Sequence, residues 1–285
     1  MLGEGDHDQP ARADCRGLVA WEWALRNPRP RRYLWPVAAT NGGKEAHAET
    51  RTEEEACLLT DMPTGEYTEG RRGDREKKGG QAMRVLVACE FSGTVRDVFA
   101  AKGHEAWSCD LLPSETEGNH IQGDVLELLD DEWDLVIAHP PCTYLTVAGN
   151  KYFNPEYRDR FPDRIQQREE AIEFVRSFFA ARVPMMAIEN PIGVLSTRIG
   201  KPTQIVQPYQ FGHPDRKPTC LWLRGLPKLA PTQIVEPNIK TNRNGKTASC
   251  HHDEALRLTP DERWKARSRT YKGIAAAMAE QWGTR

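Results

Sequence analysis

The sequence predicts an α/β fold with a doubly wound, mostly parallel sheet, and three observations support this prediction. From residue 83 onward, short apolar runs typical of buried strands alternate with helical patterns. A glycine-containing turn joins the first run to a helix, and an acidic residue ends the second run about 20 residues later. Two further runs end in polar residues and prolines, which stop a strand because proline cannot donate a ladder hydrogen bond.

Composition and cysteine usage place the chain among reduced globular proteins. It is 39% hydrophobic and 28% charged, and no apolar run approaches the roughly 20 residues of a membrane helix. The first residues are polar and acidic, so they do not predict a signal peptide. The seven cysteines form no CxxC pair. We therefore expect a protein of the cytoplasm without disulfides.

Charge is divided unevenly along the chain, although the net charge is only −2. Residues 83–138 hold 3 Lys and Arg against 12 Asp and Glu, a balance of −9, whereas residues 139–285 hold 23 against 14, a balance of +9. A basic second half favours a polyanionic substrate. Two solvated surfaces of different charge explain the same pattern equally well.

Residues 1–82 differ from the rest in having charged and turn-forming residues without sustained periodicity. We expect them to be a disordered extension. An alternative is that translation begins at Met83, because codons for Lys78, Gly79 and Gly80 can spell a purine-rich ribosome-binding site just before it. The first 82 residues would then be an over-extended reading frame.

The first predicted unit is a nucleotide-binding half: strand 84–89, turn 90–94, helix 95–102 and strand 104–109. Gly93 in the turn permits close backbone approach, and the following helix N-terminus favours a negatively charged group. Asp110 would hold ribose hydroxyls. Asp124 ends a short strand before a helix at 126–129, beside the same crevice. A turn glycine, a solvent-facing Asp110 and a helix-capping Asp124 are the alternative interpretation.

The candidate nucleophile is Cys142, which follows strand 134–138 and the rigid pair Pro140-Pro141. The carboxyl ends of parallel strands are where open α/β sheets bind ligands. Strand 184–188 ends at Glu189, so a thiol and a carboxylate are predicted on neighbouring strand ends. The alternatives are a small buried cysteine and a capping or ion-paired carboxylate.

The remaining segments carry weaker signals. Residues 143–150 are predicted to be a loop that could close over a substrate. A long amphipathic helix is predicted at 166–182, and a final helix at 274–282. Residues 225–268 are proline-rich and polar, with no predicted core, and we expect them to be mostly loop. They include Cys250-His251-His252, but no second cluster has zinc-site spacing, so we expect no metal. The other strands are predicted at 204–206 and 219–223.

The order of these pieces resembles the cytosine-5 DNA methyltransferase family over about residues 83–285, which implies a Rossmann-like fold that uses S-adenosylmethionine. Pro140-Pro141-Cys142 is similar to the nucleophile motif of that family, and Glu189-Asn190 to its next catalytic motif, with Pro191 in place of the usual valine. Residues 212–217 resemble its arginine motif, and residues 271–275 its last motif. Residues 91–93 resemble its cofactor motif but lack the second glycine.

The main departure from the family is size. The family inserts a substantial target-recognition domain before its last motif, whereas here only residues 225–268 fill that gap. We therefore expect sequence specificity to be short or loose, or to be supplied by a protein partner. The compact form is similar to small phage and prophage methyltransferases, which implies a bacterial or phage-infected cell.

The resemblance implies a reaction in which the Cys142 thiolate attacks C6 of a flipped cytosine in double-stranded DNA, while Glu189 acts at N3. A desolvated Glu189 with a raised pKa would suit that role best. Arg216 would hold the base O2 or a nearby phosphate. The implied cofactor-binding residues are Phe91, Ser92, Gly93, Asp110, Asp124 and Pro140. The implied substrate-binding residues are Pro141, Thr143, Asn190 and Lys217.

Other functions fit parts of the same pattern. Amino-methyltransferases also use a proline pair, but usually place an aromatic residue after it, where this chain has Cys142. The reduced recognition region is compatible with a methyltransferase for RNA or free nucleotides. The incomplete cofactor motif is compatible with a non-catalytic nucleic-acid-binding protein. The sequence does not say whether the transferred group is methyl or a larger one.

Overall fold

The computed structural model describes residues 82–241, 244–245, 247–249 and 258–284, all in one compact unit of the chain. The strands of its main sheet are β1 (Arg84–Ala88), β2 (Glu105–Asp110), β3 (His120–Gln122), β4 (Leu135–Ala138), β5 (Met185–Pro191), β6 (Gln204–Val206) and β7 (Thr219–Arg224). The α-helices are α2 (Thr94–Ala101), α3 (Arg164–Ala180), α4 (Leu195–Arg198), α6 (Pro260–Ser268) and α7 (Lys272–Trp282). The 3-10 helices are η2 (Val125–Leu128), η3 (Val147–Phe153), η4 (Pro155–Tyr157) and η5 (Pro208–Gln210).

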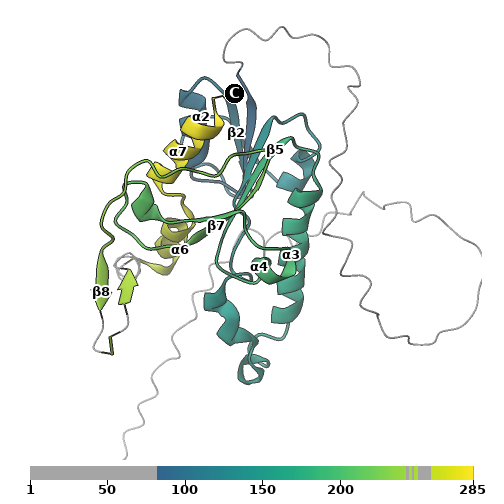
Figure 1. The fold of residues 1–285 in the computed structure, drawn as a ribbon. Helices are drawn as coiled ribbons and strands as arrows, with labels where there is room; N and C mark the ends of the chain where they lie inside the picture. The colour runs from purple at the N-terminus through teal and green to yellow at the C-terminus, as the bar shows by residue number, and fades with distance from the viewer. Residues whose placement is uncertain (1–81, 242–243, 246, 250–257, 285) are drawn as a thin grey trace, which may run out of the picture. The chain divides into compact units, whose positions relative to one another are not determined.

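The seven strands form one mixed sheet in the order β3-β2-β1-β4-β5-β7-β6 (Figure 1). The first five strands of that order are parallel, whereas β7 runs antiparallel to both β5 and β6. The order 3-2-1-4-5 is that of a doubly wound nucleotide-binding sheet. The predicted α/β class with a mostly parallel sheet is therefore confirmed, and the arrangement is compatible with a Rossmann-like fold.

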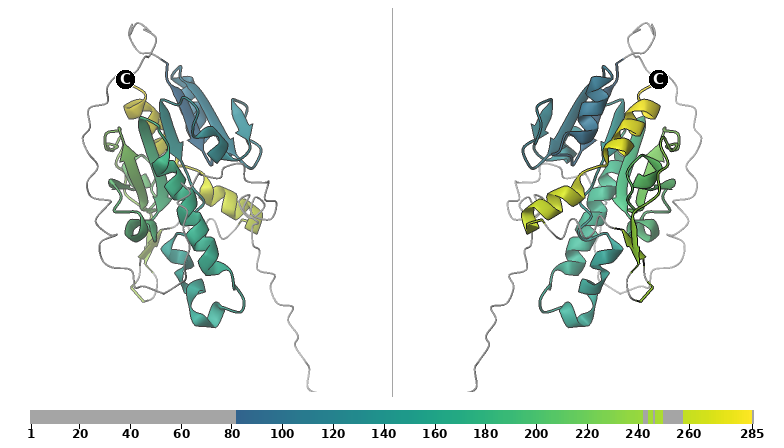
Figure 2. Two further views of the ribbon diagram at one scale, coloured as in Figure 1. Left: turned by 90° about the vertical axis from the view of Figure 1, so that its right-hand side faces the viewer. Right: turned by 90° about the vertical axis from the view of Figure 1, so that its left-hand side faces the viewer.

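Both faces of the sheet are covered, which explains why its central strands are continuously apolar. Val85 and Val87 of β1 point into a core shared with α2 and α7, while Leu86 and Ala88 point into a second core shared with α3. The two views of Figure 2 look at the molecule from opposite sides, with α3 in front in one and α7 in front in the other. All four of these β1 side chains are fully buried.

The strand order creates a switch point between β1 and β4. From β1 the chain proceeds outward through β2 and β3, and it then returns to place β4 on the opposite side of β1. Connections leave β1 and β4 in opposite directions, so a crevice opens at the carboxyl ends of these two strands. The residues that follow β1 and β4 are therefore the first candidates for ligand contacts.

The structure differs from the sequence prediction mainly in residues 225–268. These residues include a hairpin of β8 (Ile239–Thr241) and β9 (Thr247–Ser249), and the helix α6. Thr259 caps α6 through a reciprocal pair of hydrogen bonds with Glu262, and proline occupies the first turn. The pattern that predicts this helix start, Thr259 followed three residues later by Glu262, was present in the sequence. The segment is therefore not the predicted loop throughout.

Other predicted elements are present with small shifts at their ends; for example, the helix predicted at 166–182 is α3. The segment predicted as a loop at 143–150 contains the beginning of η3. The expectations for residues 1–81 and for Cys250-His251-His252 concern positions outside the described residues. Within the described ranges, no helix is both long and apolar enough to cross a membrane.

A buried arginine organises the turn between β1 and α2. Arg96 is 1% exposed. Its guanidinium donates to the hydroxyls of Ser108 (3.1 Å) and Thr116 (2.6 Å) and to the carbonyl of Glu117 (2.8 Å). These bonds tie the β2–β3 connection against Gly93, which has φ of 71°. A Cβ at Gly93 would lie 2.1 Å from the Thr116 hydroxyl and 2.5 Å from an Arg96 nitrogen.

We predict that Gly93→Ala destabilises the fold more than Gly103→Ala, which is its matched control. Both glycines have positive φ, but a Cβ at Gly103 would meet nothing within 4 Å. Gly103→Ala should therefore cost only the backbone strain, about 1–2 kcal/mol. Gly93→Ala should cost about 1–3 kcal/mol more because it displaces hydrogen-bonded side chains. Urea unfolding measures both values, and equal losses would contradict the proposed role of Arg96.

Candidate active site

Two neighbouring strands deliver the candidate catalytic residues to one edge of the sheet. In the β4–β5 pair, Ala138 lies beside Ile188, so the next residue of each strand, His139 or Glu189, follows at the same level. Neighbouring strands lie about 4.8 Å apart, which brings the two side chains within contact distance. Nδ1 of His139 lies 3.3 Å from Oε2 of Glu189. Sequence reasoning did not assign a role to His139.

The nucleophile loop is anchored to the end of β5. Asn190 is 1% exposed, and its side-chain amide donates to the carbonyl of Pro140 at 2.8 Å. Pro140 is buried, Pro141 half-buried, and Cys142 exposed. The Cys142 carbonyl accepts from the backbone N–H groups of the residues three and four positions later, at 3.0 and 3.1 Å. A turn held at both ends therefore presents the thiol, and Asn190 acts here as its anchor.

A second contact joins the residues after Cys142 to those after β5. The N–H of Val194 donates to the carbonyl of Leu145 at 2.8 Å, and Val147 donates to the carbonyl of Ile192 at 3.2 Å. Gly193 approaches the Leu145 carbonyl so closely that a Cβ would lie 2.0 Å from its oxygen. The first part of the predicted substrate-closing loop is thus fixed in this structure. Thr143 is exposed, and its carbonyl accepts from Arg164 at 3.3 Å.

The charges of three residues act on the Cys142 thiol. Water can reach the residue, but protein atoms surround the sulfur, and this desolvation is the largest cause that raises the pKa of Cys142. The negative charge of Glu189 raises that pKa further. Lys217 and Arg267 oppose it with positive charge. The net direction is upward, so the free protein carries this group mainly as the thiol at neutral pH.

The pKa of Glu189 is shifted by burial and by its neighbours in opposite directions. Its side chain is 21% exposed, and burial by itself raises the pKa of the carboxyl. The hydrogen bond and charge of His139, together with the charge of Lys217, outweigh burial, so the net pKa of Glu189 is lowered. The free protein therefore does not have the raised pKa that would suit proton donation best, and His139 is the main reason.

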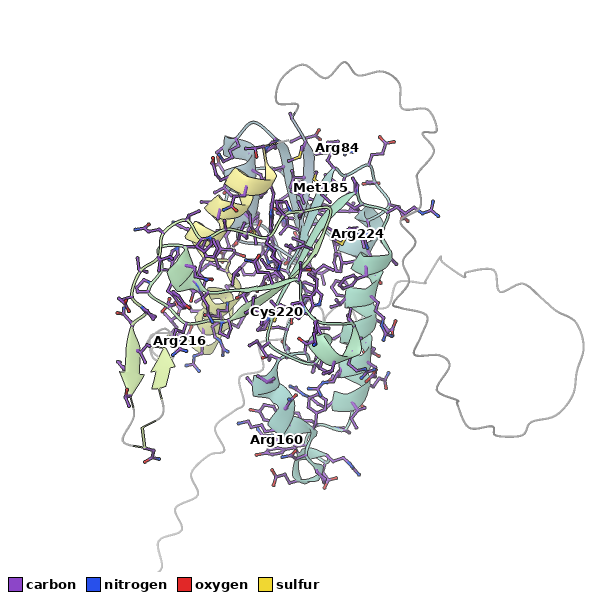
Figure 3. All side chains as sticks on the ribbon, in the orientation of Figure 1. Arg84, Arg160, Met185, Arg216, Cys220 and Arg224 are labelled. Atoms are coloured by element: carbon purple, nitrogen blue, oxygen red, sulfur yellow. The ribbon has the colours of Figure 1, made fainter. Side chains whose placement is uncertain are left out.

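The two basic residues of the predicted arginine motif have different positions. Lys217 reaches the site: its Nζ donates to the carbonyl of Arg267 at 2.9 Å and lies 5.7 Å from the Tyr271 ring centroid. Arg216 is exposed, and in the view of Figure 3 it lies toward the β8 hairpin. The positive charges that act on Cys142 are thus Lys217 and Arg267, although Arg216 was the predicted catalytic residue.

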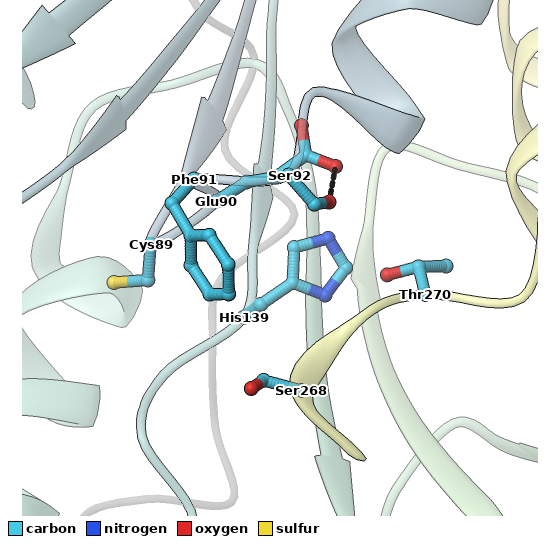
Figure 4. A pocket seen from close by; sticks show the side chains of 7 residues that line it. All are labelled: Cys89, Glu90, Phe91, Ser92, His139, Ser268 and Thr270. Atoms are coloured by element: carbon cyan, nitrogen blue, oxygen red, sulfur yellow. Dashed lines mark hydrogen bonds between the residues drawn. The ribbon is translucent and has the colours of Figure 1, made fainter. Parts of the chain in front are cut away.

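A small pocket, with a volume of about 10 Å³, lies at the switch point of the sheet, where the strand order predicted a crevice (Figure 4). It begins with residues that follow β1, including Phe91 and Ser92, both 7% exposed. His139 forms another wall, so this pocket adjoins the Cys142–Glu189 edge. The complete lining consists of Cys89, Glu90, Phe91, Ser92, His139, Ser268 and Thr270.

The N-terminus of α2 was predicted to favour a bound negative group, but the side chain of Glu90 occupies that position. It is 5% exposed, and its carboxylate accepts from the N–H groups of Val95 (2.7 Å) and Arg96 (3.1 Å). Figure 4 shows its further hydrogen bond from Ser92, at 3.4 Å. Because the first free N–H groups of α2 already have an anionic partner, this position is filled.

The two predicted acids lie near the same pocket. Burial is the largest cause that raises the pKa of Asp110, and Glu90 adds to it, while the backbone N–H of Leu112 opposes it through a bond of 2.9 Å. Asp110 and Asp124 both raise the pKa of the Cys89 thiol, after burial. Asp124 is exposed and caps η2 through the N–H of Leu126 at 3.0 Å. The alternative interpretation of Asp124, as a residue that caps a helix, is therefore present in the structure.

The end of α6 and the residues after it cover the pocket. Trp264 packs against Phe91 with ring centroids 5.6 Å apart. Arg269 forms an ion pair with Glu115, at 3.0 Å from Nε and 2.7 Å from an Nη atom. Ser268 and Thr270 contribute to the lining. Sequence reasoning missed this cover because it treated residues 225–268 as loop.

Comparisons with known proteins add no assignment. No family model matches the chain, and no curated protein matches it significantly. Within the ranges that the structure describes, no group of three or more His, Cys, Asp or Glu side chains is arranged to hold a metal ion. Any function must therefore be argued from the residues themselves.

We predict that the pH profile of Cys142 alkylation by iodoacetamide shifts in opposite directions in two variants. Glu189→Gln removes a charge that raises the pKa of Cys142, so alkylation should begin at lower pH than in the wild type. Lys217→Met removes a charge that lowers this pKa, so alkylation should require higher pH.

Mass spectrometry of the peptide that carries Cys142 gives the rate at each pH. Lys228→Met is the control, because Lys228 is an exposed lysine that does not shift the Cys142 pKa, and its profile should match the wild type. Identical profiles for all variants would show that the three groups do not share one electrostatic site.

Proposed function

We propose that this protein is a DNA methyltransferase that transfers a methyl group from S-adenosylmethionine to C5 of cytosine. The observation that carries the proposal is a strand-end thiol, Cys142, coupled to a carboxylate, Glu189, beside a pocket at the switch point of a doubly wound sheet. The resemblance of Pro140-Pro141-Cys142 and Glu189-Asn190 to the family motifs supports the same assignment. Reduced thiols suit the cytoplasm of a bacterial or phage-infected cell.

The charge of the pocket supports a cationic cofactor. Glu90 lines it, Asp110 and Asp124 lie close by, and the α2 N-terminus is already capped. Three carboxylates and a filled anion position disfavour the polyphosphate of a dinucleotide. They favour the sulfonium and amino groups of S-adenosylmethionine. Phe91 would supply apolar contact and Asp110 would hold ribose hydroxyls once Trp264 and α6, which now leave a space of only about 10 Å³, move away. When bound, this cofactor supplies an electrophilic methyl group.

The chain's own residues would activate the base. C5 of cytosine is a poor nucleophile until the Cys142 sulfur bonds to C6, which makes the ring an enamine that is nucleophilic at C5. A proton donated to N3 by way of Glu189 stabilises the negative charge that develops on N3. After methyl transfer, water takes the C5 proton, and the C5–H electron pair restores the C5–C6 double bond and expels the thiolate. Lys217, near both groups, would stabilise negative charge during these steps.

A basic hollow beside the pair supports a polyanionic substrate. It has a volume of about 260 Å³, and its lining contains His213, Lys217, Arg269 and Lys272. Lys217 is common to this hollow and to the electrostatic surroundings of Cys142, so a phosphate bound there would lie next to the reacting base. A base inside a stacked duplex cannot reach Cys142, so we propose that double-stranded DNA binds with the target cytosine flipped out.

Bisulfite sequencing of DNA from cells that express the full chain tests this function. We expect protected cytosines in a short or loose sequence context in wild-type cells. Cys142→Ser should abolish protection, because its hydroxyl is a much weaker nucleophile at neutral pH. Cys220→Ala should retain protection, because Cys220 is buried in β7 and does not line the pocket.

Three results would contradict the proposal. Protection that survives Cys142→Ser would favour amino-group methylation, which needs no thiol. Absence of both protection and S-adenosylmethionine binding by calorimetry would favour a non-catalytic nucleic-acid-binding protein. If the protein binds the cofactor and methylates RNA or free nucleotides but leaves DNA unmodified, the substrate is RNA or a nucleotide rather than DNA.

A further inference from the structure

His139 connects the two halves of the proposed site. Its side chain is 8% exposed and lies between the cofactor pocket and the end of β5. Nδ1 faces Oε2 of Glu189 at 3.3 Å. Within the described part of the chain, the buried Nε2 has no hydrogen-bond partner. A buried imidazole nitrogen without a partner is costly, so its retention at this position requires a reason.

Glu189 alone is poorly suited to the proton donation that the proposed reaction requires. Its lowered pKa means that the free carboxyl is ionised at neutral pH and carries no proton for N3. The residue that chiefly opposes burial and keeps Glu189 ionised is His139, through its hydrogen bond and charge. An imidazole is also the side chain type whose protonation changes between about pH 5 and 8, where a proton can be both held and released.

We propose that His139 is a positioning residue that orients Glu189 and shares with it the proton delivered to N3 of the target base. This inference rests on the proposed cytosine-5 chemistry, and it deepens that proposal by naming the source of the proton. Glu189 remains the residue that touches the base. His139 acts through it, from the opposite side of the carboxylate.

Each proton and electron pair in this reaction has a source and a destination. The Cys142 thiol gives its proton to water as its sulfur forms the bond to C6; the C5=C6 electron pair moves to C4–C5, and the C4=N3 pair moves to N3. The Nδ1 proton of His139 passes to the ionised Glu189 carboxylate, and the carboxyl so formed gives a proton to N3. Once C5 has received the methyl group, the N3 pair re-forms C4=N3, and the N3 proton returns to the His139–Glu189 pair. Water then takes the C5 proton, the C5–H pair forms C5=C6, and the C6–S pair leaves with the sulfur, which regains a proton from water. The pair is unchanged after one turnover.

Other charged or titratable groups also face Glu189, and they predict how the pair responds to pH. Lys217, ahead of β7, lowers the pKa of Glu189, whereas burial raises it. Cys142 and Cys220 both interact with its charge. Neither cysteine donates a hydrogen bond to the carboxylate in this structure. The group that acts there both through a hydrogen bond and, when protonated, through its charge is His139.

The decisive experiment is a pH titration of Glu189 in the ligand-free full chain, followed by NMR of ¹³Cδ-labelled glutamate. A spectrum of Glu189→Gln identifies the signal. The titration midpoint of Glu189 should move to higher pH in His139→Gln, which loses both the charge and the donor at Nδ1. It should move less in His139→Asn, whose amide nitrogen can occupy the position of Nδ1. A midpoint that is unchanged in His139→Gln would overturn the proposal.

A second measurement uses only the wild-type chain and so does not depend on a variant that folds. The ¹⁵N shifts of the His139 ring at neutral pH should show a proton on Nδ1, and an unprotonated Nδ1 would also overturn the proposal. Both tests are made without cofactor or DNA, so they can fail while methylation is observed, or succeed while it is not. If methylation is observed, His139→Gln should lower kcat by about 10²-fold and change KM little.

Discussion

The register between β4 and β5 is the constraint on which the site depends. Because Ala138 and Ile188 lie side by side, the two strands release His139 and Glu189 at one level of the sheet edge. A shift of one residue would turn Glu189 to the other face, since side chains alternate along a strand. The bond from Asn190 to the Pro140 carbonyl then fixes the loop that presents Cys142. The chemistry proposed here needs all of these placements at once.

The same strand order divides the site into two electrostatic parts. Carboxylates gather after β1 and β2, where the pocket lies, while Lys217 and Arg267 act near the thiol. This division agrees with the acidic first half and basic second half of residues 83–285. A cationic cofactor and a polyanionic substrate would each meet the opposite charge. His139 lies between the two parts, because it lines the pocket and also faces Glu189.

Local patterns predicted the sheet and the ends of its strands, because apolar runs that stop at prolines are informative without tertiary context. The helix α6 was missed although Thr259 and Glu262 form a recognisable start signal, since the surrounding composition suggested a loop. The roles of Glu90 and His139 could not be read from the sequence. Both depend on which residues lie beside them after folding, and the lowered pKa of Glu189 follows from one such neighbour.

The central claim is that the Cys142 sulfur bonds to a pyrimidine ring, and trapping that bond tests it most directly. A duplex that contains 5-fluorocytosine, incubated with the protein and S-adenosylmethionine, should give a stable adduct, because fluorine at C5 cannot leave as a proton does. Mass spectrometry should then locate the nucleotide on the peptide that carries Cys142, and Cys142→Ser should give none. No adduct, or an adduct at another cysteine, would contradict the account.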